Sequence, residues 1–86
     1  MNLLWSAAAW DEYIWFYNHE PKLLKKLNRL ILECRRTPFE GKGKPEPLKY
    51  EFTGHWSRRI NEEHRLVYRV EDETLIIVGC RFHYDD

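Results

Sequence analysis

The sequence is poor in cysteine and has no long apolar run. Its two cysteines, Cys34 and Cys80, do not have the spacing of a zinc site. Each lies in an apolar stretch, so we expect two buried thiols and no disulfide. No stretch approaches the length that spans a membrane, and the first residues lack the basic and apolar segments of a signal peptide. We therefore expect a cytoplasmic protein with no membrane partner.

Motifs for nucleotides, metals and triad catalysis are also missing. The segment Gly41-Lys42-Gly43-Lys44 does not complete the dinucleotide-binding fingerprint, and no Ser or Thr follows Lys44 as a phosphate-binding loop requires. Ser57 has no evident base beside it, since its neighbour Arg58 is not a general base. The sequence therefore predicts neither a cofactor nor a metal.

The net charge is zero, from 14 basic and 14 acidic residues, but the charges are not evenly spread. No Lys or Arg precedes Lys22. Basic residues then dominate as far as Arg69, and acids return at residues 71–73 and 85–86. A neutral total can hide a basic face, and phosphate responds to the local charge. A mixed, solvated surface explains the same pattern equally well, so charge alone leaves RNA binding open.

A chain of 86 residues predicts one domain, spanning residues 1–86, with one modest core. The first half reads as a short strand at residues 2–5, a helix at residues 7–18 and a second helix from Pro21 to the Thr37-Pro38 step. Residues 18–20 join the helices, so the two should form an antiparallel hairpin.

An apolar stripe at helical spacing is expected to turn the first helix toward the core. The stripe comprises Trp10, Tyr13, Ile14 and Tyr17. Trp15 and Phe16 fall outside it and form either a second layer of core or an exposed patch for a partner. In the second helix the stripe comprises Leu23, Leu27, Leu30, Ile31 and Cys34.

The second half of the chain predicts a sheet. Strands are expected at residues 48–52, 56–60, 65–70 and 74–82, separated by short polar turns. Three successive strands with short turns form an antiparallel meander, and the helical hairpin must cover one of its faces. The predicted fold class is therefore α+β, with an N-terminal strand and a two-helix hairpin packed on a small antiparallel meander sheet.

One carboxylate lies in an unusual setting. Glu46 stands between Pro45 and Pro47, directly after a loop with two glycines and two lysines. Prolines restrict the backbone on both sides, and glycines let a backbone approach a ligand closely. The loop is therefore suited to hold an acid beside an anion.

Basic and imidazole side chains are predicted to converge on this loop. Arg59 and Arg65 come from neighbouring strands, and His83 lies at the end of the last strand. A base, an acid and guanidinium groups suit phosphodiester cleavage, in which the base takes the ribose 2′-hydroxyl proton and the acid protonates the leaving 5′-oxygen. This set needs no metal. Each residue type is common on surfaces, so salt bridges to the many acids are a competing explanation for the arginines.

The other three histidines are assigned less specific places. His19 is expected in the loop between the helices and His55 in a turn. His64 precedes Arg65 and either orients it or lies on the surface.

Longer segments resemble one protein family. The run from Arg36 to Lys49, RTPFEGKGKPEPLK, looks like the central motif of the YoeB/Txe toxins, which belong to the RelE superfamily of bacterial toxin–antitoxin systems. Segments 56–60, 63–68 and 81–84 match the rest of that pattern, as do residues 3–6 and Trp10-Asp11. The resemblance extends over nearly the whole chain and implies a RelE-like fold.

The resemblance also implies a function. Family members are ribosome-dependent endoribonucleases that cleave mRNA in the ribosomal A site and arrest translation, leaving a 2′,3′-cyclic phosphate and a 5′-hydroxyl. By resemblance, Glu46 is expected to be the general base and His83 the general acid. Arg65, assisted by Arg59, would stabilise the transition-state phosphate, and Tyr84 would position the nucleotide.

Binding residues and partners follow from the same resemblance. Lys44, Lys49 and Arg58 are expected to contact mRNA or ribosomal RNA. The implied partners are mRNA, the 70S ribosome, a YefM-like antitoxin and a second copy of the chain. The alternative function is a non-catalytic module that binds the ribosome or an antitoxin and blocks translation without cleavage.

Overall fold

The computed structural model describes residues 1–82 and contains two helices and five strands. Helix α1 (Ala7–His19) and helix α2 (Pro21–Arg36) follow one another with a single residue between them. The Ser6 hydroxyl accepts a hydrogen bond from the Ala9 amide at 3.1 Å and so caps α1. Pro21 opens α2, where its missing N–H costs nothing.

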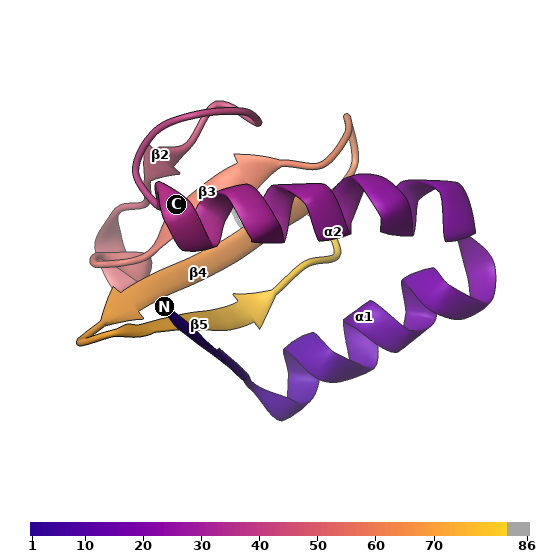
Figure 1. Cartoon of the computed structure of the whole chain (residues 1–86), viewed down its shortest axis with the longest axis horizontal. Helices are drawn as coiled ribbons and strands as arrows, with labels where there is room; N and C mark the ends of the chain where they lie inside the picture. The colour runs from indigo at the N-terminus through magenta and orange to yellow at the C-terminus, as the bar shows by residue number, and fades with distance from the viewer. Residues whose placement is uncertain (83–86) are drawn as a thin grey trace.

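The sheet has the strand order β1-β5-β4-β3-β2. Strands β3 (Trp56–Arg59), β4 (Arg65–Glu71) and β5 (Thr74–Gly79) form the predicted antiparallel meander. Strand β2 (Glu46–Pro47) extends it antiparallel to β3, and β1 (Asn2–Trp5) lies parallel to β5 at the other edge (Figure 1). The predicted α+β class is confirmed, and β1 makes the sheet mixed.

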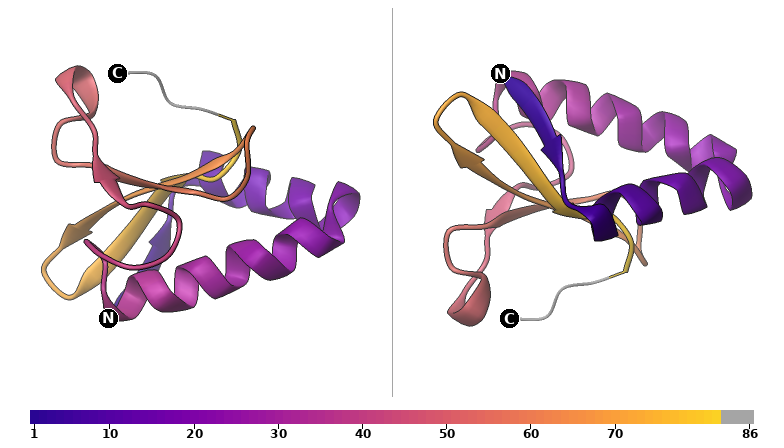
Figure 2. Two further views of the ribbon diagram at one scale, coloured as in Figure 1. Left: turned by 90° about the horizontal axis from the view of Figure 1, so that it is seen from above. Right: turned by 90° about the horizontal axis from the view of Figure 1, so that it is seen from below.

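Both helices lie on one side of the sheet, whereas the short 3-10 helix η1 (Tyr50–Phe52) projects on the other (Figure 2). Along β4 and β5 the side chains alternate, so that Leu66, Tyr68, Leu75 and Ile77 face the helices and join the core. The opposite face, which neither α1 nor α2 covers, carries the alternate residues.

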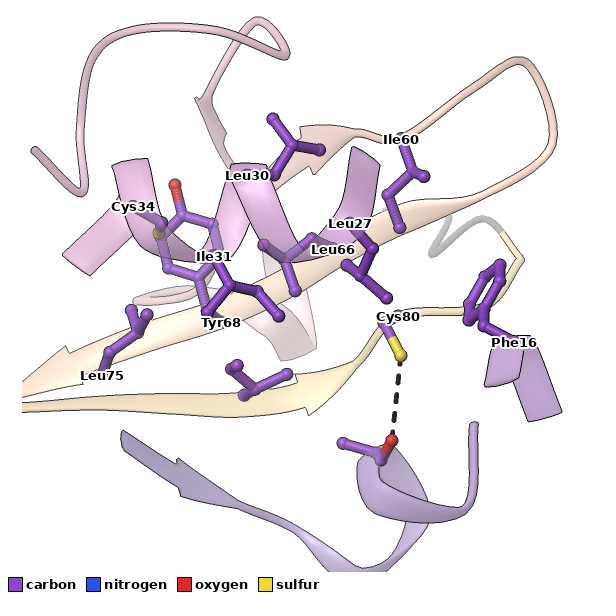
Figure 3. Packing of buried hydrophobic residues seen from close by; sticks show 12 residues of the cluster. Phe16, Leu27, Leu30, Ile31, Cys34, Ile60, Leu66, Tyr68, Leu75 and Cys80 are labelled. Carbon is purple, nitrogen blue, oxygen red and sulfur yellow. Dashed lines mark hydrogen bonds between the residues drawn. The ribbon is translucent and has the colours of Figure 1, made fainter. Parts of the chain in front are cut away.

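The core lies between the sheet and the helical hairpin (Figure 3). Helix α2 contributes its predicted stripe, of which Leu27, Leu30, Ile31 and Cys34 are buried. Cys34 and Cys80 are buried free thiols, as predicted. Burial raises the pKa of Cys80 to about 12, so this sulfur stays protonated, and it lies 3.7 Å from the Ala9 carbonyl oxygen.

The expected core stripe of α1 is wrong for three of its four residues, since only Tyr13 packs against the core. The side chains of Trp10 and Tyr17 are 48% and 67% exposed, whereas Ala9 and Phe16 are fully buried. Trp15 is partly buried against the core. The helix is apolar on most of its surface, so spacing alone does not identify the face that packs.

Two strand boundaries also differ from prediction. Residues 48–52 are not a strand, because the chain leaves β2 at Pro47 and turns into η1, where Tyr50 has a φ of +56°. Strand β5 ends at Gly79 rather than at Phe82. Within residues 1–82, no helix has the length and apolar character that would cross a membrane.

Candidate active site

The loop before Glu46 is fixed to the sheet by Gly43. The Gly43 carbonyl accepts a 2.6 Å hydrogen bond from the Arg59 amide. Gly43 has a φ of +84°, and a Cβ there would lie 3.1 Å from both the Arg58 Cβ and the Arg59 carbonyl oxygen. Only glycine meets both conditions without strain. Glu46 then pairs with Ser57 in the sheet, which places its carboxylate on the face opposite α1 and α2.

Two arginines lie beside this carboxylate. Arg59 and Arg65 are directly opposite one another on β3 and β4. A cavity of about 60 Å³ is lined by Gly43, Lys44, Glu46, Ser57, Arg59 and Arg65. The structure therefore brings together four of the predicted site residues: Lys44, Glu46, Arg59 and Arg65.

The guanidinium of Arg65 is held in position by the preceding turn. Its Nη1 donates to the carbonyls of Asn61 and His64, at 2.9 and 3.3 Å. The Asn61 side chain fixes this turn, because its oxygen accepts hydrogen bonds from the amides of Glu63 and His64. Like charges directly opposite on a sheet repel one another, so an anion bound between Arg59 and Arg65 relieves that repulsion.

This arrangement can bind a phosphate next to a proton acceptor. Two guanidiniums and the Lys44 ammonium supply positive charge, and the carboxylate of Glu46 supplies a base at the rim of the same cavity. Charge stabilisation and proton transfer are the two contributions that phosphodiester cleavage requires from side chains.

His64 supports this site from inside the fold and does not lie on the surface. Its ring is 3% exposed and packs against Phe16 and Phe82, with centroid separations of 5.1 and 5.5 Å. Its Nδ1 accepts a 2.8 Å hydrogen bond from the Phe82 amide, and the Phe82 carbonyl accepts from the Arg65 amide at 3.1 Å. His64 and Arg65 together fix the last described residue.

The ring of His64 is held neutral. Burial lowers the pKa of His64 below 6.5, and Arg81 adds to that effect, whereas Glu63 opposes it. The Glu63 carboxylate lies 3.4 Å from Nε2. Since Nδ1 accepts a hydrogen bond, the neutral ring carries its proton on Nε2.

Arg58 is placed differently from the prediction. Its side chain is fully buried, and its guanidinium donates to the carbonyls of Thr37, Glu40 and Lys42. It also donates to the Tyr68 hydroxyl at 3.2 Å and pairs with Glu33 at 3.3 Å. A buried guanidinium with these partners is not available to RNA, so the expected RNA contact of Arg58 is not supported by its position.

The anchoring role of Arg58 was not predicted from the sequence, although the alternation of side chains along β3 indicated it. The alternation of β3 places Arg58 on the same side as Trp56 and Ile60, which is the apolar side. An arginine on that side must either be paired or be buried at high cost.

The remaining predicted residues lie elsewhere. Lys49 is exposed at the start of η1 and does not line the cavity. His83 and Tyr84 lie outside the described residues. In residues 1–82, no three or more His, Cys, Asp or Glu side chains gather as a metal-binding group.

Comparisons with known proteins identify relatives over nearly the whole chain. The family described as "YoeB-like toxin of bacterial type II toxin-antitoxin system" matches residues 5–84. Toxin YoeB from Escherichia coli K12 is 57% identical over 84 residues, which cover 98% of this chain and 100% of that protein. Toxin YoeB from a Synechocystis species is 52% identical, with 98% of each chain covered.

Solved structures give the same result. A YoeB/ParE toxin from Agrobacterium tumefaciens is 46% identical and superposes with a TM-score of 0.92, covering 98% of this chain and 100% of that one. The YoeB dimer from Staphylococcus aureus is 45% identical, with a TM-score of 0.90 and 98% of each chain covered.

A more distant structure, the RelBE2 toxin–antitoxin complex from Mycobacterium tuberculosis, shares the fold alone. It is 22% identical, has a TM-score of 0.73, and the match covers 95% of this chain and 96% of that one. The fold is thus RelE-like. The match to the family over residues 5–84 and the 57% identity to a YoeB toxin are consistent with the fold and with the motif around Glu46. The chain belongs to the YoeB-like toxin family of bacterial type II toxin–antitoxin systems.

Proposed function

We propose that the protein is a ribosome-dependent endoribonuclease that cleaves mRNA in the ribosomal A site and arrests translation. The observation that carries the proposal is the cavity shared by Lys44, Glu46, Arg59 and Arg65. It combines a base with several cations on the sheet face opposite α1 and α2. Membership of a toxin family supports the same conclusion.

The roles follow from the chemistry of RNA. The Glu46 carboxylate takes the proton of the ribose 2′-hydroxyl, and the resulting oxygen attacks the adjacent phosphorus. Arg65, held by its two carbonyl partners, and Arg59 stabilise the charge that develops on the phosphate. His83 gives a proton to the departing 5′-oxygen, which leaves a 2′,3′-cyclic phosphate and a 5′-hydroxyl. Tyr84 positions the nucleotide.

Lys44 and Lys49 contact the RNA backbone in this proposal. Lys44 lines the cavity, and Lys49 lies exposed beyond β2. A lysine that neutralises a phosphate adds affinity without sequence preference.

The proposed partners, besides mRNA and the 70S ribosome, are a YefM-like antitoxin and a second copy of the chain, and the proposed location is the cytoplasm. Relatives from Staphylococcus aureus form a YoeB–YefM complex and a YoeB dimer. Their sequences are 45% identical to this chain over 98% of its length.

Purified protein in a cell-free translation reaction tests the function, with primer extension to map new mRNA 5′ ends. The wild-type protein should create ends within A-site codons. Glu46→Gln and His83→Gln should lower the cleavage rate by about 10²–10⁴-fold, the usual contribution of a positioned acid or base. Glu51→Gln, which changes an exposed glutamate outside the cavity, is the matched control and should cleave normally.

Two outcomes would contradict the proposal. Full cleavage by Glu46→Gln and His83→Gln would remove the assigned roles. Arrest of translation without new mRNA ends would favour the alternative, a module that blocks the ribosome without cutting.

A further inference from the structure

A second, larger hollow lies beside the candidate active site. It has a volume of about 580 Å³ and runs between helix α2 and the loop that leads to Glu46. We call it the α2 groove. It is lined by Lys26, Arg29, Leu30, Leu32, Glu33, Arg36, Lys42, Gly43, Lys44 and Arg59. Its volume lies within the range of about 300–1,000 Å³ that is usual for ligand sites.

The groove is strongly basic. Its lining includes six basic side chains and one acidic side chain, that of Glu33. The Glu33 carboxylate is already engaged, since it pairs with Arg58 at 3.3 Å and accepts from the Lys42 amide at 3.1 Å. Among residues 1–82, none of the six basic side chains has an ion-pair partner. Unpaired cations gathered around one hollow favour an anionic ligand.

The groove continues into the active-site cavity. Gly43, Lys44 and Arg59 line both hollows. A polymer that places one phosphate between Arg59 and Arg65 therefore finds further cations along the groove.

Among residues 1–82, no aromatic side chain lines the groove, so this part of the chain offers no platform there on which bases could stack. Leu30 and Leu32 line the groove together with the basic residues, and long basic side chains combine apolar stems with charged ends. Such a lining follows a phosphodiester backbone and is indifferent to base sequence.

We propose that the α2 groove binds the backbone of the single-stranded mRNA that flanks the cleaved bond. The proposal rests on the proposed function only in taking the Glu46 cavity as the place of the reacting phosphate. Continuity with that cavity favours the substrate strand over an acidic protein segment. The proposal gives a role in binding the RNA backbone to Lys26, Arg29, Arg36 and Lys42.

Binding of 2′-O-methyl oligonucleotides, which cannot be cut by 2′-oxygen attack, tests the groove without any cleavage. Fluorescence anisotropy at several low salt concentrations gives the affinity for a trinucleotide and for strands lengthened on the 5′ or the 3′ side. Lengthening on one side should raise the affinity of the wild-type protein. It should do so equally for different base sequences.

The variant Lys26→Ala/Arg29→Ala should remove that gain and leave trinucleotide binding unchanged. Each lost phosphate contact lowers the salt slope of single-strand binding by about 0.7, so the double variant should lower it by about 1.4. The matched control is Lys22→Ala/Lys25→Ala, which removes the same charge from exposed positions of the same helix that do not line the groove.

Three results would overturn the proposal. One is wild-type affinity that does not depend on strand length. Another is an equal loss of affinity in both double variants, which would indicate that the overall positive charge of the helix, and not the groove, attracts the RNA. The third is tighter groove-dependent binding of an oligoglutamate peptide than of RNA of equal charge. Groove-dependent RNA binding by a protein that creates no new mRNA ends during translation would instead reject only the proposed function.

Discussion

Among single residues, Arg58 and Tyr68 hold the loop that carries the candidate site. The Arg58 guanidinium donates to three loop carbonyls and to the Tyr68 hydroxyl, and that hydroxyl donates to the Pro38 carbonyl at 2.5 Å. Burial raises the pKa of Tyr68, so the hydroxyl remains a donor throughout the neutral range. The position of the loop thus depends on a buried network in which these polar groups serve as hydrogen-bond partners for one another.

Tyr68→Phe is expected to lower the free energy of unfolding by about 1–3 kcal/mol, because Arg58 Nε and the Pro38 carbonyl each lose a partner. Urea denaturation measures the change. Tyr17→Phe is the control, since the Tyr17 ring is mostly exposed, and it should change the value by less than about 0.5 kcal/mol. Equal stability of Tyr68→Phe and the wild-type protein would show that the network adds nothing.

His64 predicts a pH dependence of stability. Its pKa is lowered in the folded state by burial and by Arg81, although Glu63, Glu20 and Glu12 oppose the shift. Between the folded pKa and 6.5, the unfolded chain binds more protons than the folded one. The free energy of unfolding should therefore fall as the pH is lowered from about 7.5 through the folded pKa, since protonated Nδ1 no longer accepts from Phe82.

His64→Asn separates this effect from other titrations. The Asn side-chain oxygen can accept from the Phe82 amide but does not titrate in this range. Urea denaturation across the same pH series should give a flatter profile for His64→Asn than for the wild-type protein. Parallel profiles would assign the pH dependence to groups other than His64.

At the scale of elements, the loop from Gly41 to Lys44 determines where β2 begins. Its prediction from sequence succeeded because proline and glycine have strong backbone preferences of their own. The prediction of a strand at residues 48–52 failed because the chain turns there, with Tyr50 at a positive φ that residues other than glycine seldom adopt. The residue types of this segment did not indicate that turn.

Gly43→Ala tests the contact between this loop and β3. An added Cβ would meet the Arg58 Cβ and the Arg59 carbonyl oxygen at 3.1 Å. Gly54→Ala is the matched control, because Gly54 also has a positive φ but has no atom within 4 Å of its Cβ position. Urea denaturation should show an additional loss of about 1–3 kcal/mol in Gly43→Ala, and equal losses would contradict the tight contact.

The candidate site was predictable to the extent that strand pairing determines it. The register of β3 with β4 brings Arg59 opposite Arg65, and a meander with short turns implies such neighbours. The burial of Arg58 and His64 was harder to infer, because it depends on which loop and helix cover them. Likewise, α1 packs mainly through Ala9 and Phe16, with Tyr13 as the single residue of the expected stripe against the core, since residues on several of its faces are apolar.

For the whole molecule, the exposed apolar face of α1 predicts self-association. Its exposed apolar side chains are those of Trp10, Ile14 and Tyr17. We expect a dimer in solution that buries this face, and Trp10→Glu should shift it toward the monomer. Analytical ultracentrifugation measures the change, with Lys22→Glu as the control at an exposed position of α2. A dimer of undiminished stability in Trp10→Glu would place the interface elsewhere.

The position of β1 has a consequence for how the chain is made. Its pairing partner β5 lies at the other end of the sequence, from Asn2 beside Thr74 to Trp5 beside Ile77. Translation produces β1 long before β5, so β1 has no partner strand while the intervening residues are made. The sheet is completed only once β5 has emerged. Under the proposed function, a nascent toxin therefore has its complete sheet only after β5 has left the ribosome that makes it.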